Sequence, residues 1–199
     1  MKSLSTKKAI NGIAACFRNS KALLEDANIL FDSKKYCRSF ALSQFSIEEA
    51  GKSLILFEVY FKILIGKRNE IDFSEVSKNF KSHISKSLKT VLMEFREHPY
   101  DTLKEKEYDE FIKTITKEID DSKTKYDKLK NQSLYVSYNN NNFFMPEDLF
   151  TKEVSKNHLL KAKQRLNICS GHITKYLSII SDANSNEKIS LIKVNEALK

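Results

Sequence analysis

A regular repeat of apolar residues near the C-terminus restricts the fold more than any other feature of the chain. Between residues 159 and 180 the repeat alternates three- and four-residue steps through Leu159, Ala162, Leu166, Cys169, Ile173, Tyr176 and Ile180. This spacing places all seven side chains on one face of an α-helix. It predicts a long helix from about Pro146 to Ile180 with one buried face.

The remainder of the chain shows similar helical patterns. The presence of only four Gly and two Pro residues argues against many tight turns. We expect further helices over 5–31, 34–65, 72–98, 102–130 and, at the C-terminus, 189–198, with Gly66 and Pro99 as stop signals. Because residues 54–65 are apolar on nearly all sides, the second helix should be central. The predicted fold is all-α, an up-and-down bundle of four to five long helices.

The expected organisation is a single helical domain over residues 1–181. A loop or extended insertion should interrupt it near residues 131–146, where 134–138 is β-prone and 139–142 is a run of polar residues typical of a mobile tip. Residues 182–199 should form a polar break followed by the short terminal helix.

The composition favours some partners and argues against several classes of site. A net charge of +8 suits contact with phosphates or an acidic partner, although scattered lysines also serve solubility alone. The cysteines Cys16, Cys37 and Cys169 lack metal-ligand spacing and are interpreted as reduced thiols. No targeting segment, membrane span, zinc pattern or Gly-rich phosphate loop is recognisable. We therefore expect a cytoplasmic protein with no metal, no other cofactor and no membrane partner.

Acidic and basic residues interrupt the apolar pattern of the second helix. Glu48 and Lys52 are four residues apart and share a face that also carries Phe45 and Ile55. Glu49 lies beside them. Burying a charge is costly unless it is paired, so this pair is either a structural ion pair that fixes the helix register or part of a functional site.

His83 and Lys86 form a second candidate cluster in the third predicted helix. His83 occupies a core-facing step between Phe80 and Ser87. Since the second and third helices should be adjacent, Glu48 is the expected partner of His83. Such a cluster is either a structural polar network or an acid/base site.

A third candidate pair lies on the long C-terminal helix. Arg165 and His172 are seven residues apart and so lie on one face, at the edge of the apolar stripe, with His158 seven residues upstream. A boundary position suits a cleft open to solvent. An Arg and a His at this spacing also occur by chance in long helices, so a structural role stays open.

Three segments together resemble the AbiV family of bacterial abortive-infection proteins, a branch of the HEPN superfamily. They are Ser46–Lys52 (SIEEAGK), Phe80–Lys86 (FKSHISK) and Lys130–Val136 (KNQSLYV), within a similarity that runs from about Ala9 to Tyr176. The resemblance implies a HEPN-like helical bundle that dimerises and takes part in defence against phage. It also implies that Arg165 and His172, with six intervening residues, correspond to the Arg–His pair of the metal-independent HEPN ribonucleases. The residue after Arg165 is Leu166, where the commonest form of that motif has a polar residue.

Two functions follow as hypotheses. In the first, the protein is a HEPN-type endoribonuclease that halts phage multiplication by acting on RNA or the translation machinery. Its catalytic residues are then Arg165 and His172, with Glu48, Glu49, Lys52, His83 and Lys86 as a supporting or alternative cluster. In the second, it is a non-catalytic protein that blocks a phage or translation target. A constitutively active ribonuclease would kill its host, so the first function requires a trigger, and we expect a phage product acting on residues 139–146. The apolar residues of segment 143–150 offer a homodimer interface or a hinge.

Overall fold

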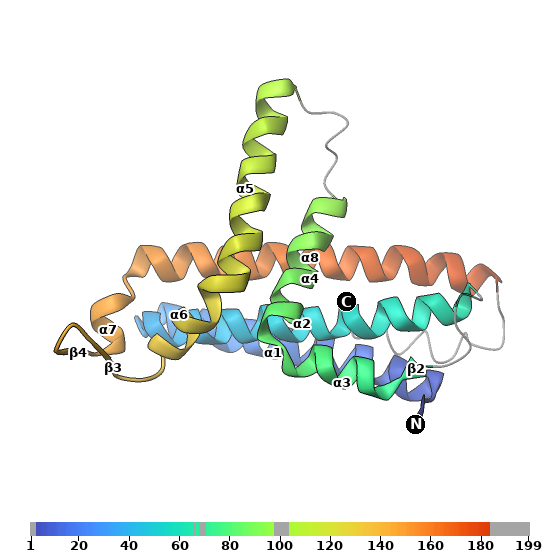
Figure 1. The fold of residues 1–199 in the computed structure, drawn as a ribbon, viewed down its shortest axis with the longest axis horizontal. Helices are drawn as coiled ribbons and strands as arrows, with labels where there is room; N and C mark the ends of the chain where they lie inside the picture. Colours follow the sequence, from blue (N-terminus) through green and yellow to red (C-terminus); the bar gives the residue numbers. More distant parts are fainter. Residues whose placement is uncertain (1–2, 66, 68–70, 98–103, 184–199) are drawn as a thin grey trace.

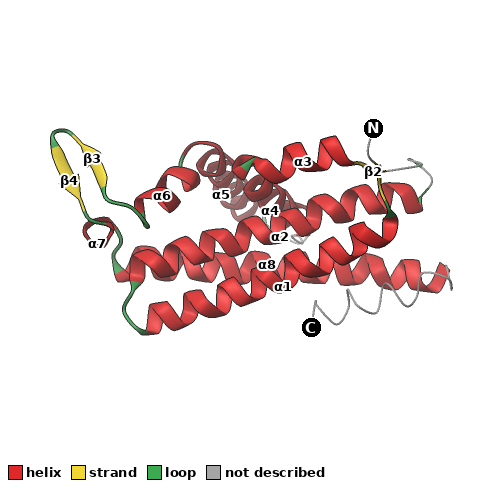
Figure 2. Ribbon diagram, turned by 90° about the horizontal axis from the view of Figure 1, so that it is seen from below, coloured by secondary structure: helices red, strands yellow, loops and turns green. Residues whose placement is uncertain are grey.

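The computed structural model describes residues 3–65, 67, 71–97 and 104–183, and in this part the chain is almost entirely helical. Three long helices lie side by side (Figure 1 and Figure 2): α1 (Thr6–Asp32), α2 (Tyr36–Leu64) and α8 (Lys152–Ala183). The predicted all-α class is therefore confirmed. The expected terminal helix over 189–198 and the stop signals at Gly66 and Pro99 lie outside the described residues.

The second helix is the centre of the molecule, as the apolar pattern predicts. α2 contacts α1, α8, α4 and α6, and most of its side chains are buried. Small polar residues allow α1 and α2 to approach closely: the Ser20 and Ser46 hydroxyls each donate to the other's backbone carbonyl, at 2.7 and 2.8 Å. Around this contact the core is filled by apolar side chains such as Phe17, Leu54 and Ile173.

The third predicted helix is in fact two helices, α3 (Phe73–Lys81) and α4 (His83–Glu97). Ser82 adopts an extended conformation, and its hydroxyl accepts the backbone N–H of Ser85 at 3.0 Å. A serine that caps a helix N-terminus in this way competes with continuation of the preceding helix. The prediction of one continuous helix over 72–98 was therefore wrong, and the break turns α4 away from the long helices (Figure 1).

The fourth predicted helix is likewise divided, into α5 (Glu105–Thr124) and α6 (Tyr126–Gln132), at Lys125. α4 and α5 project together from the long helices as a helical hairpin, hereafter the α4–α5 hairpin (Figure 1). The fifth predicted helix starts with a short turn, α7 (Pro146–Leu149), which is separated from α8 by Phe150 and Thr151.

Strands are few and short. β1 (Ser3–Leu4) pairs antiparallel with β2 (Ile71–Asp72), and β3 (Ser137–Asn139) pairs antiparallel with β4 (Asn142–Phe144). The β-prone segment 134–138 contributes its last two residues, Ser137 and Tyr138, to β3. Asn140 and Asn141 form the turn with φ of 48° and 63°, left-handed values that Asn tolerates better than most residues.

Candidate functional site

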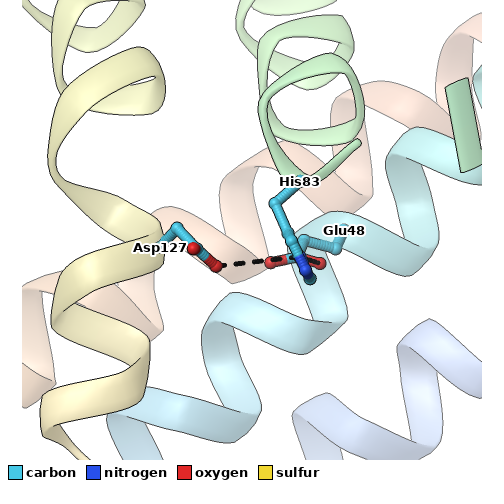
Figure 3. A group of neighbouring side chains, drawn as sticks. All are labelled: Glu48, His83 and Asp127. Carbon is cyan, nitrogen blue, oxygen red and sulfur yellow. Dashed lines mark hydrogen bonds and ion pairs between the residues drawn. The ribbon is translucent and has the colours of Figure 1, made fainter. Parts of the chain in front are cut away.

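Glu48 is the centre of a polar cluster buried between α2, α4 and α6. Its side chain is only 4% exposed. Oε2 lies 2.6 Å from His83 Nδ1 and 2.9 Å from Lys86 Nζ, and Oε1 accepts from Lys130 Nζ at 3.0 Å. Figure 3 shows His83 of α4 and Asp127 of α6 directed toward Glu48 of α2. The expected proximity of Glu48 and His83 is confirmed.

The charges of this Glu48 cluster balance. Lys130 Nζ also pairs with Asp127 Oδ1 at 2.7 Å, so two carboxylates face two ammonium groups. Burial by itself would raise the pKa of Glu48, but the hydrogen bonds from Lys86, Lys130 and His83 outweigh it and hold that pKa below its ordinary value. Glu48 is therefore ionised at neutral pH.

The donor atoms of Glu48, His83 and Asp127 lie within 4.8 Å of one another, a spacing that would suit a metal ion. However, Lys130 Nζ lies among them, at 3.0 Å from Glu48, 2.9 Å from His83 Nδ1 and 2.7 Å from Asp127. A metal would have to displace this ammonium group and would still face the buried Lys86. The donor set fits a lysine better than a divalent cation.

Gly51 permits the close approach of α2 and α4 on which the cluster depends. A Cβ atom at this position would lie 2.1 Å from the backbone carbonyl oxygen of Lys86. Any side chain there would push α4 away and separate Glu48 from His83 and Lys86. In the Glu-Glu-Ala-Gly sequence of α2, both Glu48 and Gly51 face α4. Glu48 supplies the carboxylate, and Gly51, which has no side chain, leaves room for the backbone of α4.

Two details of the prediction for this cluster were wrong. Lys52 pairs with Glu49 rather than with Glu48, because the two sit one turn apart on the half-buried edge of α2. His83 is not a core residue: its side chain is 45% exposed, because it begins α4 at the rim of the cluster. Lys130 and Asp127 were missed as site residues, since only the fold brings α6 against α2.

Arg165 is the centre of a second polar cluster, between α8 and the α4–α5 hairpin. Its Nε donates to Glu94 Oε2 at 3.2 Å and its Nη2 to Glu118 Oε2 at 2.6 Å. The guanidinium side chain is fully buried, and within the described part of the chain its Nη1 has no hydrogen-bond partner. Lys161 and the Tyr126 hydroxyl also bind Glu118. Despite burial, the cations Lys161 and Arg165 hold the pKa of Glu118 below its ordinary value.

His172 lies two turns further along α8 and also faces α4. Its Nδ1 is 2.7 Å from Glu97 Oε1, and its ring packs against Phe57 and Tyr176. Burial lowers the pKa of His172, and the bond to Glu97 offsets this only in part. The imidazole is therefore neutral at pH 7, with Nδ1–H donating to Glu97 and Nε2 left as the basic nitrogen.

A pocket of about 440 Å³ opens beside His172. Its aromatic wall consists of Phe57, Phe61 and Tyr176, and its basic rim consists of Lys62, Lys67, Lys89 and Arg96. Arg96 lies over the Tyr176 ring and donates to its hydroxyl at 3.0 Å. Glu58, the acid of the pocket wall, pairs with Lys89. The pocket therefore combines flat apolar surfaces with positive charge.

The prediction that Arg165 and His172 share a face is confirmed, since both bond to carboxylates of α4. The expected boundary position was wrong, because the α4–α5 hairpin covers the edge of the α8 stripe and buries both residues. His158 does not join them. It stacks on Phe40 and bonds to Gln44 of α2, and burial holds its pKa well below the ordinary value.

Cys169 lies between Arg165 and His172 in the sequence but has no part in an acid/base site. It is fully buried in the core, and burial raises the pKa of its thiol to about 12. A thiol in this state is not a nucleophile at neutral pH.

These features define the class of protein as an all-helical bundle that carries an Arg–His pair on its last long helix. A family model described as AbiV, of the HEPN type, matches residues 8–167, and the chain belongs to this family. Membership indicates a role in abortive infection, a form of phage defence. No curated protein and no solved structure matches the chain. Among the described helices, none is long and apolar enough to cross a membrane.

Proposed function

We propose that this protein halts phage multiplication as a metal-independent endoribonuclease whose reaction centre is the pocket beside His172. The observation that carries the proposal is the combination of a neutral histidine, held at Nδ1 by Glu97, with aromatic walls and a basic rim. Aromatic walls suit stacked bases, and a basic rim suits phosphates.

The chemistry follows from the protonation state of His172. Its Nε2 accepts the proton of a ribose 2′-OH while that oxygen attacks the adjacent phosphorus. The bond from phosphorus to the 5′-oxygen breaks, giving a 2′,3′-cyclic phosphate. The proton for the leaving 5′-oxygen comes from a second histidine, whose charged form is favoured by the negative charge of the bound phosphate. Arg165 supplies the fixed positive charge that stabilises the pentavalent transition state.

One chain offers one such histidine, so we propose a homodimer in which two chains supply the base and the acid. Part of the expected interface segment 143–150 is not available, because Phe150 is buried against Phe40. We therefore place the contact surface on the exposed apolar residues of segment 135–145. They are Tyr135, Val136, Tyr138, Phe143 and Met145. We further propose a cytoplasmic RNA or ribosome-associated target, and a phage product as the trigger.

Cleavage of RNA by the purified protein in EDTA tests this function. We expect cleavage to be lost in His172→Ala and retained in His83→Ala, which removes the exposed histidine of the Glu48 cluster. The reverse pattern would move the reaction to that cluster. Absence of cleavage by the parent protein, both alone and with phage-infected cell extract, would contradict the enzymatic function.

The non-catalytic alternative has its own supporting observation, the enclosure of Arg165 by two carboxylates. A plaque assay separates the two functions. Full protection from phage by the Arg165→Ala/His172→Ala double variant would favour a protein that acts by binding alone. Loss of protection, with the variant still folded, would support catalysis.

A further inference from the structure

We propose that the α4–α5 hairpin is an inhibitory clamp on the proposed ribonuclease site, and this inference rests on the proposed function. Each of the two active residues on α8 is held by carboxylates of the hairpin. Glu94 and Glu118 enclose Arg165, and Glu97 holds His172. At Arg165, the carboxylates of Glu94 and Glu118 thus occupy the positions that phosphate oxygens would take.

The charges in this arrangement oppose binding of RNA at Arg165. The guanidinium group has two carboxylates within 3.2 Å and a fully buried side chain. A phosphate would meet like charges from Glu94 and Glu118 before it reached Arg165, and the low dielectric of the interior strengthens that repulsion. In this conformation Arg165 is an internal ion-pair partner rather than a phosphate ligand.

One hydrogen-bond donor in the clamp also lacks an acceptor. Arg165 Nη1 is buried and has no hydrogen-bond partner among the described residues. A buried donor without an acceptor favours any state that supplies one. A phosphate oxygen would supply one once Glu94 and Glu118 had moved.

The construction of the hairpin suits such a movement. α4 starts immediately after the extended residue Ser82, and α5 ends at Thr124, so that Lys125 separates it from α6. These two breaks lie at the base of the hairpin, next to the Glu48 cluster, which ties the start of α4 and α6 to α2. Hinges usually lie at the ends of elements.

Above that base, the contact between the hairpin and α8 is not fully packed. A pocket of about 390 Å³ opens between α5 and α8, lined on the α5 side by Phe111, Thr114 and Ile115 and on the α8 side by Asn157, Leu160 and Gln164. The hairpin can therefore tilt away from α8 about its anchored base, which would free Arg165 from Glu94 and Glu118.

Chemical labelling of Arg165 tests the clamp without relying on cleavage. Phenylglyoxal modifies accessible guanidinium groups, and mass spectrometry follows each arginine, with the exposed Arg18 as the internal reference. We expect Arg165 to be protected in the parent protein and labelled about tenfold faster in Glu94→Gln/Glu118→Gln, the size of a typical coupling between sites. The control is Glu58→Gln, which removes a carboxylate that lies near His172 but pairs with Lys89. This variant should leave the labelling of Arg165 unchanged.

Cleavage of RNA in EDTA by the same variants separates this inference from the function on which it rests. Faster labelling with faster cleavage supports both. Faster labelling without cleavage by any variant supports the clamp and contradicts the ribonuclease. Unchanged labelling in a double variant that keeps its helical circular dichroism overturns the clamp. If the double variant unfolds, the single variant Glu94→Gln replaces it in the labelling experiment, because it keeps the bond from Arg165 to Glu118. Unchanged labelling of Arg165 in Glu94→Gln then overturns the clamp.

Discussion

Gly51 of α2 faces the backbone of Lys86 in α4 so closely that a methyl group on Gly51 would lie 2.1 Å from the Lys86 carbonyl oxygen. The two helices can meet only because this position has no side chain. We predict that Gly51→Ala destabilises the protein by about 3 kcal/mol or more, since overpacking and loss of the Glu48 contacts act together. Urea denaturation followed by circular dichroism measures the change.

Gly171 provides the matched control. It lies in α8, is exposed, and an added Cβ would meet nothing within 4 Å. Because Ala is the better helix former, Gly171→Ala should stabilise the protein by about 0.5–1 kcal/mol. Equal effects of the two substitutions would show that the approach of α2 and α4 does not depend on Gly51.

The second prediction concerns Glu48. Its removal leaves Lys86 and Lys130, both nearly fully buried, without their shared carboxylate. We expect Glu48→Ala to lower the free energy of unfolding by about 3–5 kcal/mol, the usual effect of breaking a buried ion pair. The control is Glu110→Ala on the exposed face of α5, which should change stability by less than about 0.5 kcal/mol. Similar melting of Glu48→Ala and the parent would argue that the cluster adds nothing to stability.

A third prediction concerns the pH dependence of stability above the range in which carboxylates titrate. Burial lowers the pKa of His158 and His172 in the folded state, and both return to about 6.5 on unfolding. Below that pH the unfolded chain binds more protons than the folded one, so the free energy of unfolding must fall as the pH is lowered. The limiting slope is about 1.4 kcal/mol per pH unit for each histidine.

Denaturation between pH 7 and 5 measures this slope. We expect His158→Asn to be less stable than the parent at pH 7. Its free energy of unfolding should also change less steeply with pH, by up to the slope that one proton contributes. His83→Asn serves as the control, because His83 is half-exposed and lies in the other cluster. An unchanged slope in His158→Asn would show that His158 is not kept neutral by burial.

The fourth prediction tests the proposed dimer. Phe143 in β4 is 77% exposed and packs on Tyr138, so the folded monomer should tolerate Phe143→Ser. Light scattering at micromolar concentration should give twice the 23.1 kDa of one chain for the parent and the mass of one chain for Phe143→Ser. Ile29→Ser, at an exposed apolar position of α1, should remain dimeric. A parent protein of 23.1 kDa would refute the dimer.

Much of the fold could be predicted because helical periodicity is a local property of the sequence. The predicted stripe is buried from Leu159 to Ile173, whereas further along Leu177 is buried and Tyr176 only partly so. α1 and α2 lie within a few residues of their predicted bounds. The breaks at Ser82 and Lys125 were missed, because the apolar pattern continues across them and only capping and packing interrupt the helix. The link between Glu48 and His83 was found because a buried acid needs a partner.

The sequence by itself determined that the chain is helical, which faces are apolar, and that Glu48, Arg165 and His172 are polar groups on apolar faces. Only the tertiary structure decided their partners. Lys130 reaches Glu48, and Glu94 and Glu118 reach Arg165, through contacts between helices far apart in the chain. Asp127 joins the Glu48 cluster through its pair with Lys130. The reason is physical: periodicity fixes the direction in which a side chain leaves its own helix, whereas its neighbours depend on how whole helices pack.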